Sequence, residues 1–265
     1  MKKSIILLAF FSLLSTNALA QSYRFLQTEI YGLQAFGGIL QNTFSSEFKQ
    51  FGGTVSCDEF NSGSGNGVSL GVQAEYPLTN VMTVSGGFAY HDRSGLLTTS
   101  STFPIRDDNS IDGFTQAIME NRIDAGMQFL EFQADIRYHI FEVYGFVFRG
   151  IGGLRFGMPI SGEYDQKTRI VSPESIGFVV GNQVLQERTL SSGTINTFTP
   201  LQMGAVLGIE PMLRISPSMH VTAAAFYDIP FSSALSDATI HISGFRGQVG
   251  LRYSIRMFAP SPNTP

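Results

Sequence analysis

The feature that most constrains this fold is a strict two-residue alternation of polar and apolar side chains, clearest between Phe129 and Phe156. Two runs that show it are joined there by a short turn. The first run sets Glu131, Gln133, Asp135 and Arg137 against Leu130, Phe132, Ala134, Ile136 and Tyr138, and the second sets Arg149 and Arg155 against Tyr144, Phe146, Phe148, Leu154 and Phe156. Successive side chains of a strand point to opposite faces, so this stretch predicts a hairpin with one apolar and one charged face.

The composition of the two faces favours a membrane barrel. In a soluble sheet the apolar face forms the core and the polar face meets water. Here the polar face carries both charge signs and scattered glycines, and the apolar face ends in aromatic residues. That combination is typical of a barrel whose apolar side faces lipid and whose polar side faces a closed lumen.

The start of the chain predicts export. Residues 1–20 read as a signal peptide, with two lysines, an apolar run from Ile5 to Leu14, and small residues before a cut ahead of Gln21. The apolar run is too short to span a bilayer. Residues 21–258 are expected to form the barrel domain, and residues 259–265 a short Pro-rich periplasmic tail. Cys57 is the only cysteine, so no internal disulfide can form.

Composition excludes several other classes. The net charge of −4 argues against a nucleic-acid-binding protein, which would carry an excess of positive charge. No later apolar run is long enough for a membrane-spanning helix, and charged residues interrupt each candidate. An exported, strand-rich chain of this kind belongs in the periplasm, the medium or the outer membrane of a bacterium.

Alternating runs recur along the whole chain, separated by connections that are in turn long and short. Eight strands are predicted: Tyr23–Gly38, Val68–Leu78, Val81–His91, the two runs within Phe129–Phe156, Gln202–Ile215, Met219–Asp228 and Ile242–Phe258. The long connections are expected to be loops: Gln41–Gly67, Asp92–Gly126 (with helical turns at Gly113–Arg122), Gly157–Thr199 (with a β-hairpin at Ile176–Arg188) and Ile229–His241. Short periplasmic turns that alternate with long extracellular loops are typical of a transmembrane barrel. Such a barrel must close, because the backbone N–H and C=O groups of an edge strand would have no hydrogen-bond partner in lipid.

In this pattern the chain resembles the small OmpA/OmpX-type eight-stranded outer-membrane β-barrel proteins. The last strand supports the resemblance, because Gln248, Gly250, Tyr253 and Ile255 match the terminal-strand signal of that class. The resemblance implies an all-β, antiparallel, up-and-down barrel in the bacterial outer membrane. It also implies recognition by the barrel-assembly machinery during biogenesis, and contact with outer-membrane lipid and lipopolysaccharide.

The strand positions whose side chains are expected to point inward predict a network of charged residues in the lumen. Its members are Glu29, Glu75, Glu131, Asp135 and Glu210 on the acidic side, and Arg137, Arg149, Arg155, Arg214, Arg246, Arg252 and Arg256 on the basic side. Side chains just fill the interior of an eight-stranded barrel, so these charges are expected to tie the wall together and close it. A three-residue turn at Phe141–Val143 would place Asp135 opposite Arg149.

Other functions remain open from the residues. A narrow porin is one alternative, and a soluble lipocalin-like binder is another. A lipid-modifying enzyme is a third alternative. The eight-stranded outer-membrane palmitoyltransferase has His, Asp and Ser near its outer rim, and His91, Asp92 and Ser94 of this chain resemble that arrangement. Adjacent residues of a strand point to opposite faces, however, so no contact between a base and a nucleophile is expected from these positions. His241 with Asp237 offers no better geometry, and the four histidines lack metal-ligand spacing. We therefore expect no enzyme, cofactor or metal, but a structural or surface-interaction protein whose loops contact an unknown ligand.

Overall fold

The computed structural model describes residues 31–51, 54–106, 114–173, 176–180 and 183–255. The predicted signal peptide and tail, and with them Glu29 and Arg256, lie outside the described residues. Every regular element within the described ranges is a β-strand. The strands are β1 Tyr31–Phe51, β2 Thr54–Pro77, β3 Met82–Asp92, β4 Gly95–Arg106, β5 Phe114–Val143, β6 Phe146–Ser172, β7 Phe178–Val180, β8 Gln183–Leu185, β9 Glu187–Thr194, β10 Gln202–Arg214, β11 Met219–Pro230 and β12 Thr239–Ile255.

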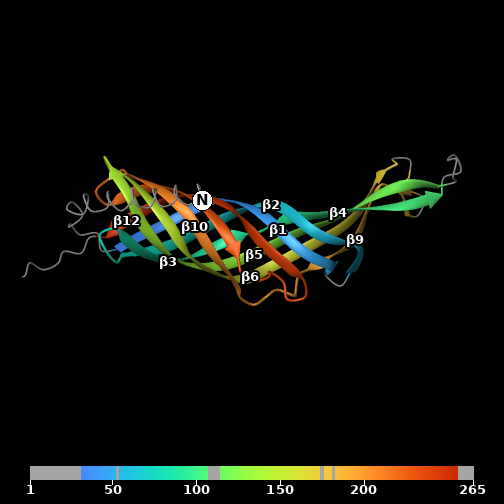
Figure 1. The fold of residues 1–265 in the computed structure, drawn as a ribbon, viewed down its shortest axis with the longest axis horizontal. Coiled ribbons are helices and arrows are strands. Elements are labelled where there is room, and N and C mark those ends of the chain that lie inside the picture. The colour runs from blue at the N-terminus through green and yellow to red at the C-terminus, as the bar shows by residue number, and fades with distance from the viewer. Residues whose placement is uncertain (1–30, 52–53, 107–113, 174–175, 181–182, 256–265) are drawn as a thin grey trace, which may run out of the picture.

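The strands close into an antiparallel ring, as predicted (Figure 1). Around the ring run β1, β2, β3 with β4, β5, β6, β10, β11 and β12, and β12 pairs back onto β1 from Ile255 opposite Tyr31 to Thr239 opposite Glu47. β3 and β4 both lie between β2 and β5, so they form one interrupted strand of an eight-stranded barrel. The short turns, 78–81, 144–145 and 215–218, all lie at one end, called here the short-turn end.

Over the half of the barrel nearest the short turns, the polarity of the two faces follows the sequence prediction. Leu207 and Val249 point outward and are 55% and 66% exposed. Glu75, Arg137 and Arg149 point inward and are at most 1% exposed. Phe146 follows directly after the turn between β5 and β6 and lies at the short-turn end.

Toward the opposite end the polarity of the two faces inverts. On β1, Gln41, Thr43 and Ser45 point outward, whereas Phe44 is completely buried inside. The predicted loops in this region are mostly strand: β1 and β2 pair through much of 41–67, β4 and β5 replace the loop and helical turns of 92–126, and β6 continues to Ser172. Figure 1 shows the β4 end of this sheet reaching far beyond the strands β3, β10 and β12.

Two irregularities mark the level of this inversion. On β6, Ile160 and Ser161 are both exposed at a bulge opposite the Gln128–Phe129 step of β5, which changes the parity of the strand. The second irregularity is the break between β3 and β4, where Asp92 lies close to Gly67 of β2. A Cβ on Gly67 would lie only 1.7 Å from the Asp92 carbonyl oxygen, so this close approach requires glycine.

The turn between β5 and β6 differs from the prediction. Tyr144 and Gly145 both have positive φ, 50° and 82°, and form a two-residue turn that pairs Val143 with Phe146. An unpaired residue between His139 and Phe141 shifts the register again. Asp135 therefore lies opposite Gly153, and the predicted pairing of Asp135 with Arg149 is wrong.

The predicted hairpin within Ile176–Arg188 is present as β7 and β8, which pair from Phe178 opposite Leu185 to Val180 opposite Gln183. Residues 181–182, between these two strands in sequence, lie outside the described residues. β9 follows directly and pairs with the far part of β6, so the sheet β4–β5–β6–β9 extends past the ring.

Candidate functional site: the barrel interior

The inward strand positions nearest the short turns form a compact set of ion pairs, which we call the lower layer. Its charged residues come from β2, β5, β6, β10 and β12: Glu75, Asp135, Arg137, Arg149, Glu210 and Arg252. Residues far apart in sequence meet here because each strand of a small barrel turns alternate side chains toward the same narrow axis.

Glu75 is the centre of the lower layer. Its carboxylate accepts hydrogen bonds from Arg137 Nη1 at 2.6 Å, from Arg149 Nη1 and Nη2 at 3.0 Å each, and from Arg252 Nε at 2.7 Å. Glu210 accepts from Arg137 Nη1 at 2.9 Å and from Arg149 Nε at 3.0 Å. The two carboxylates and the guanidinium groups of β5 and β6 therefore form a continuous bridge across the lumen.

Asp135 joins the lower layer by a different route from the predicted one. It accepts hydrogen bonds from Arg137 Nε at 2.8 Å and from the Ser85 hydroxyl at 2.5 Å. Gln133 Nε2 also donates to it, at 2.8 Å. The layer thus contains three carboxylates and three guanidinium groups among the described residues, so its formal charge is balanced.

A second set of ion pairs, the upper layer, lies farther from the short turns. It consists of His91, Arg93, Glu131, Arg155, Asp228 and Arg246, each at most 3% exposed. Arg93 bridges the two carboxylates: its Nε donates to Glu131 at 2.7 Å and its Nη2 donates to Asp228 at 3.0 Å. Arg155 Nη1 lies 3.2 Å from Glu131, and Arg246 Nη2 lies 3.6 Å from Asp228.

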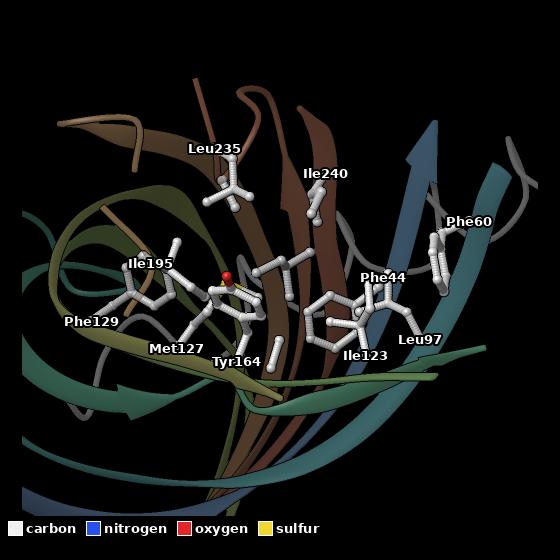
Figure 2. Packing of buried hydrophobic residues seen from close by; sticks show 13 residues of the cluster. Phe44, Phe60, Leu97, Ile123, Met127, Phe129, Tyr164, Ile195, Leu235 and Ile240 are labelled. Atoms are coloured by element: carbon white, nitrogen blue, oxygen red, sulfur yellow. The ribbon is translucent and has the colours of Figure 1, made fainter. Parts of the chain in front are cut away.

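Beyond the upper layer the same strands carry an apolar filling, the apolar cluster. Its members are Phe44, Phe60, Leu97, Ile123, Ala125, Met127, Phe129, Tyr164, Ile195, Ala234, Leu235, Ile240 and Ile242, none more than 7% exposed. Figure 2 shows their side chains converging on the interior from different walls of the barrel. Phe198, from the segment before β10, packs edge-on against Phe129 with ring centroids 5.9 Å apart. The interior is therefore filled by charged side chains near the short turns and mainly by apolar side chains beyond, where Asn42, Ser46 and Gln166 are also buried.

Most of the residues predicted for the lumen are inside. Nine of the twelve are buried in the two layers: Glu75, Glu131, Asp135, Arg137, Arg149, Arg155, Glu210, Arg246 and Arg252. Arg214 is not among them, because it lies at the exposed short-turn end, where its guanidinium donates to the carbonyls of Ser216 and Pro217. Glu29 and Arg256 lie outside the described residues.

Sequence reasoning missed three members of the upper layer. His91 and Asp228 occupy inward strand positions, so the parity alone could have included them. Arg93 is the next inward position after His91, two residues farther along the chain. It could be predicted only by extending the strand past His91. It was missed because residues 92–126 read as a loop.

The candidate enzyme residues do not form a catalytic arrangement. The Ser94 hydroxyl donates to Asp92, whereas His91 turns inward and contacts Glu131, Arg93 and Arg246. The described residues contain no group of three or more His, Cys, Asp or Glu side chains that could hold a metal ion. Of the predicted assembly signal, Gln248 is buried and Tyr253 is exposed on β12, the last described strand.

Within the described ranges, no helix has the length and apolar character needed to cross a membrane. No curated protein matches this sequence. Among solved structures, OprG of Pseudomonas aeruginosa is 10% identical, with a TM-score of 0.43, and the match covers 87% of this chain and 98% of that one. Neisserial surface protein A is 11% identical (TM-score 0.41, 85% and 97% covered), as is the outer membrane protease OmpT of Escherichia coli (TM-score 0.39, 85% and 96% covered).

The family match is more extensive than these likenesses. Residues 20–236, most of the chain, match the family described as outer membrane protein beta-barrel domain. The match agrees with the closed ring of eight antiparallel strands and with the apolar outward face of the half nearest the short turns. The chain belongs to the outer membrane protein β-barrel domain family and is a protein of the bacterial outer membrane.

Proposed function

We propose that this outer-membrane barrel is a non-conducting scaffold that presents an extracellular contact surface. The observation that carries the proposal is the filling of the interior at three successive levels. Two of them are ion-pair layers and the third is the apolar cluster, and their side chains are at most 7% exposed. A hydrated pore needs a polar path along its whole length, and buried phenylalanine and isoleucine side chains oppose one.

The contact surface would be the part of the barrel beyond the inversion of polarity. There the outward faces of β1, β2 and β4 carry serine, threonine, asparagine and glutamine, which suit water rather than lipid. Short turns face the periplasm in this class, so this extension faces the cell exterior. Loops and hairpins on a rigid scaffold commonly carry binding functions.

The tip of the extension carries exposed apolar side chains. Val184, Leu185 and Leu190 are 66%, 40% and 43% exposed on β8 and β9. These side chains lie beyond the level at which the outward face becomes polar, so lipid does not account for them. An exposed apolar group rimmed by polar residues favours a protein or lipopolysaccharide partner.

An enzymatic role is not proposed. Catalysis by the candidate residues would need His91 within reach of a nucleophile, and Ser94 instead donates to Asp92. Lipopolysaccharide and membrane lipid around the apolar belt, and the barrel-assembly machinery acting through β12, are the other proposed partners.

The contact role can be tested with bacteria that display the protein. We expect such cells to adhere to at least one surface in a panel of immobilised extracellular-matrix proteins and glycans, and a Val184→Ser/Leu190→Ser variant to lose that adherence. A Leu207→Ser variant, altered on the lipid-facing belt, serves as the control and should adhere like wild type once equal surface amounts are verified. Equal adherence of the tip variant and wild type, or no adherence of either, would contradict the contact role.

A further inference from the structure

The upper layer carries more positive than negative charge. Among the described residues it brings together three guanidinium groups, Arg93, Arg155 and Arg246, with only two carboxylates, Glu131 and Asp228. All five side chains are at most 4% exposed. With a neutral histidine, one positive charge is left without a counter-charge where water is excluded, and such a charge is costly to bury.

Hydrogen-bond donors are also in surplus there. Among the described residues, Arg93 Nη1, Arg155 Nε and Arg246 Nε are buried and have no acceptor, whereas the layer has a single buried acceptor without a donor, Asp228 Oδ1. His91 does not relieve the surplus, because its Nδ1 lies 3.4 Å from the Glu131 carboxylate and 3.3 Å from Arg93 Nη2, and its Nε2 lies 3.1 Å from Arg246 Nη1. A neutral imidazole with its proton on Nδ1 donates to Glu131 and accepts one hydrogen bond from Arg246 at Nε2, which leaves the other arginine donors without an acceptor.

The lower layer provides an internal comparison. Its three guanidinium groups face three carboxylates, and none of its arginine nitrogens is a buried donor lacking an acceptor. Two layers built from the same residue types in the same barrel therefore differ in both net charge and donor satisfaction. Of the two layers, as far as the described residues define them, the upper one alone combines excess charge with unused donors.

We propose that the upper layer binds one small monovalent anion, chloride, among Arg93, Arg155 and Arg246. A single negative charge balances the layer, and a spherical ion accepts N–H donors from several directions at once. Sulfate or phosphate would over-compensate the charge and would require more space between the strands. The anion would be a structural part of the closed interior, and this role is separate from the extracellular contact function.

The experiment measures how stability depends on chloride. Purified protein is refolded from urea into detergent in sodium chloride or in sodium gluconate at equal ionic strength, so that the ion need not penetrate a closed barrel. We expect the thermal midpoint, followed by heat-dependent gel mobility, to rise with the logarithm of chloride concentration, because a ligand of the folded state stabilises it by mass action. Gluconate should give no such rise.

Two variants locate the effect. Arg155→Gln removes the excess charge at a guanidinium whose contacts with Glu131, at 3.2 and 3.3 Å, are longer than those of Arg93, and should abolish the chloride increment. Arg252→Gln, in the lower layer, is the control and should keep it, whatever its own midpoint. In crystals grown in bromide, anomalous scattering should mark an ion within hydrogen-bond distance of these three arginines. No chloride increment in wild type, an undiminished increment in Arg155→Gln, or no bromide peak in the upper layer would overturn the proposal.

Discussion

Removal of the Glu75 carboxylate is the sharpest test of the lower layer. Glu75 is 1% exposed and accepts hydrogen bonds from Arg137, Arg149 and Arg252. In Glu75→Ala three guanidinium groups would face only two carboxylates, in a region that water does not reach. Breaking a buried ion pair by removing one partner typically costs about 3–5 kcal/mol, and we expect the unfolding free energy to fall by that amount.

The assay is equilibrium unfolding by urea in lipid vesicles, followed by tyrosine fluorescence, since the chain has nine tyrosines and no tryptophan. Glu59→Ala, at an exposed glutamate, is the matched control and should change stability by less than about 0.5 kcal/mol. Glu75→Ala combined with Arg252→Ala should recover much of the loss, because the layer returns to balanced charge. Strictly additive effects of the two substitutions would refute the charge-balance reasoning.

Three further predictions concern the wall and the extension. Leu207→Arg should destabilise the barrel in lipid vesicles by about 2–4 kcal/mol, and equal folding of this variant and wild type would mean that the face assignment is wrong. Gly67→Ala should cost about 1–3 kcal/mol, since the new Cβ meets backbone at Asp92, whereas Gly37→Ala, with no atom closer than 3.7 Å, should be near neutral; similar losses in both would exclude the steric explanation. Backbone amides that bond between β7 and β8 should exchange more slowly with deuterium than those of residues 196–200, and equally rapid exchange would argue against the hairpin.

The membrane half of this barrel was predictable because lipid imposes a simple rule on it. Every outward residue in that half must be apolar, so the two-residue period of Val68–Leu78 or Met219–Asp228 reads directly as a strand. The same period fixes which side chains enter the lumen, and nine of the twelve predicted network residues are there. Charge on the inward parity was the informative signal.

The extracellular half was not predictable by that rule, because there the outward side chains are mostly polar and many of the inward side chains are apolar. Outward Gln41, Thr43 and Ser45 made the extension of β1 look like a polar loop, although Phe44 between them is fully buried. The glycines of the Asn61–Gly67 run looked flexible, but they occupy strand β2. Gly63, Gly65 and Gly67 have no room for a Cβ against the backbone of residues 92–96.

Pairings inside the lumen depend on details that the alternation does not encode. The predicted Asp135–Arg149 contact assumed a three-residue turn, and the positive φ of Tyr144 together with a bulge before Phe141 changed the register. Arginine side chains are also long enough to reach across the lumen to non-neighbouring strands. Arg149 thus meets Glu75, which β2 contributes, as well as its ladder partner Glu210.

Electrical conductance of the wild-type protein tests the central claim, a barrel closed by its own side chains, most directly. Purified protein inserted in a planar lipid bilayer, with insertion verified by protease protection, should give no steady ionic current between −100 and +100 mV in about 1 M potassium chloride. The reason is that the side chains of both ion-pair layers and of the apolar cluster are buried in the interior. A variant with Phe44, Met127 and Phe129 changed to serine should remain closed as well, since both ion-pair layers are intact below it. A large, steady wild-type conductance would contradict the account.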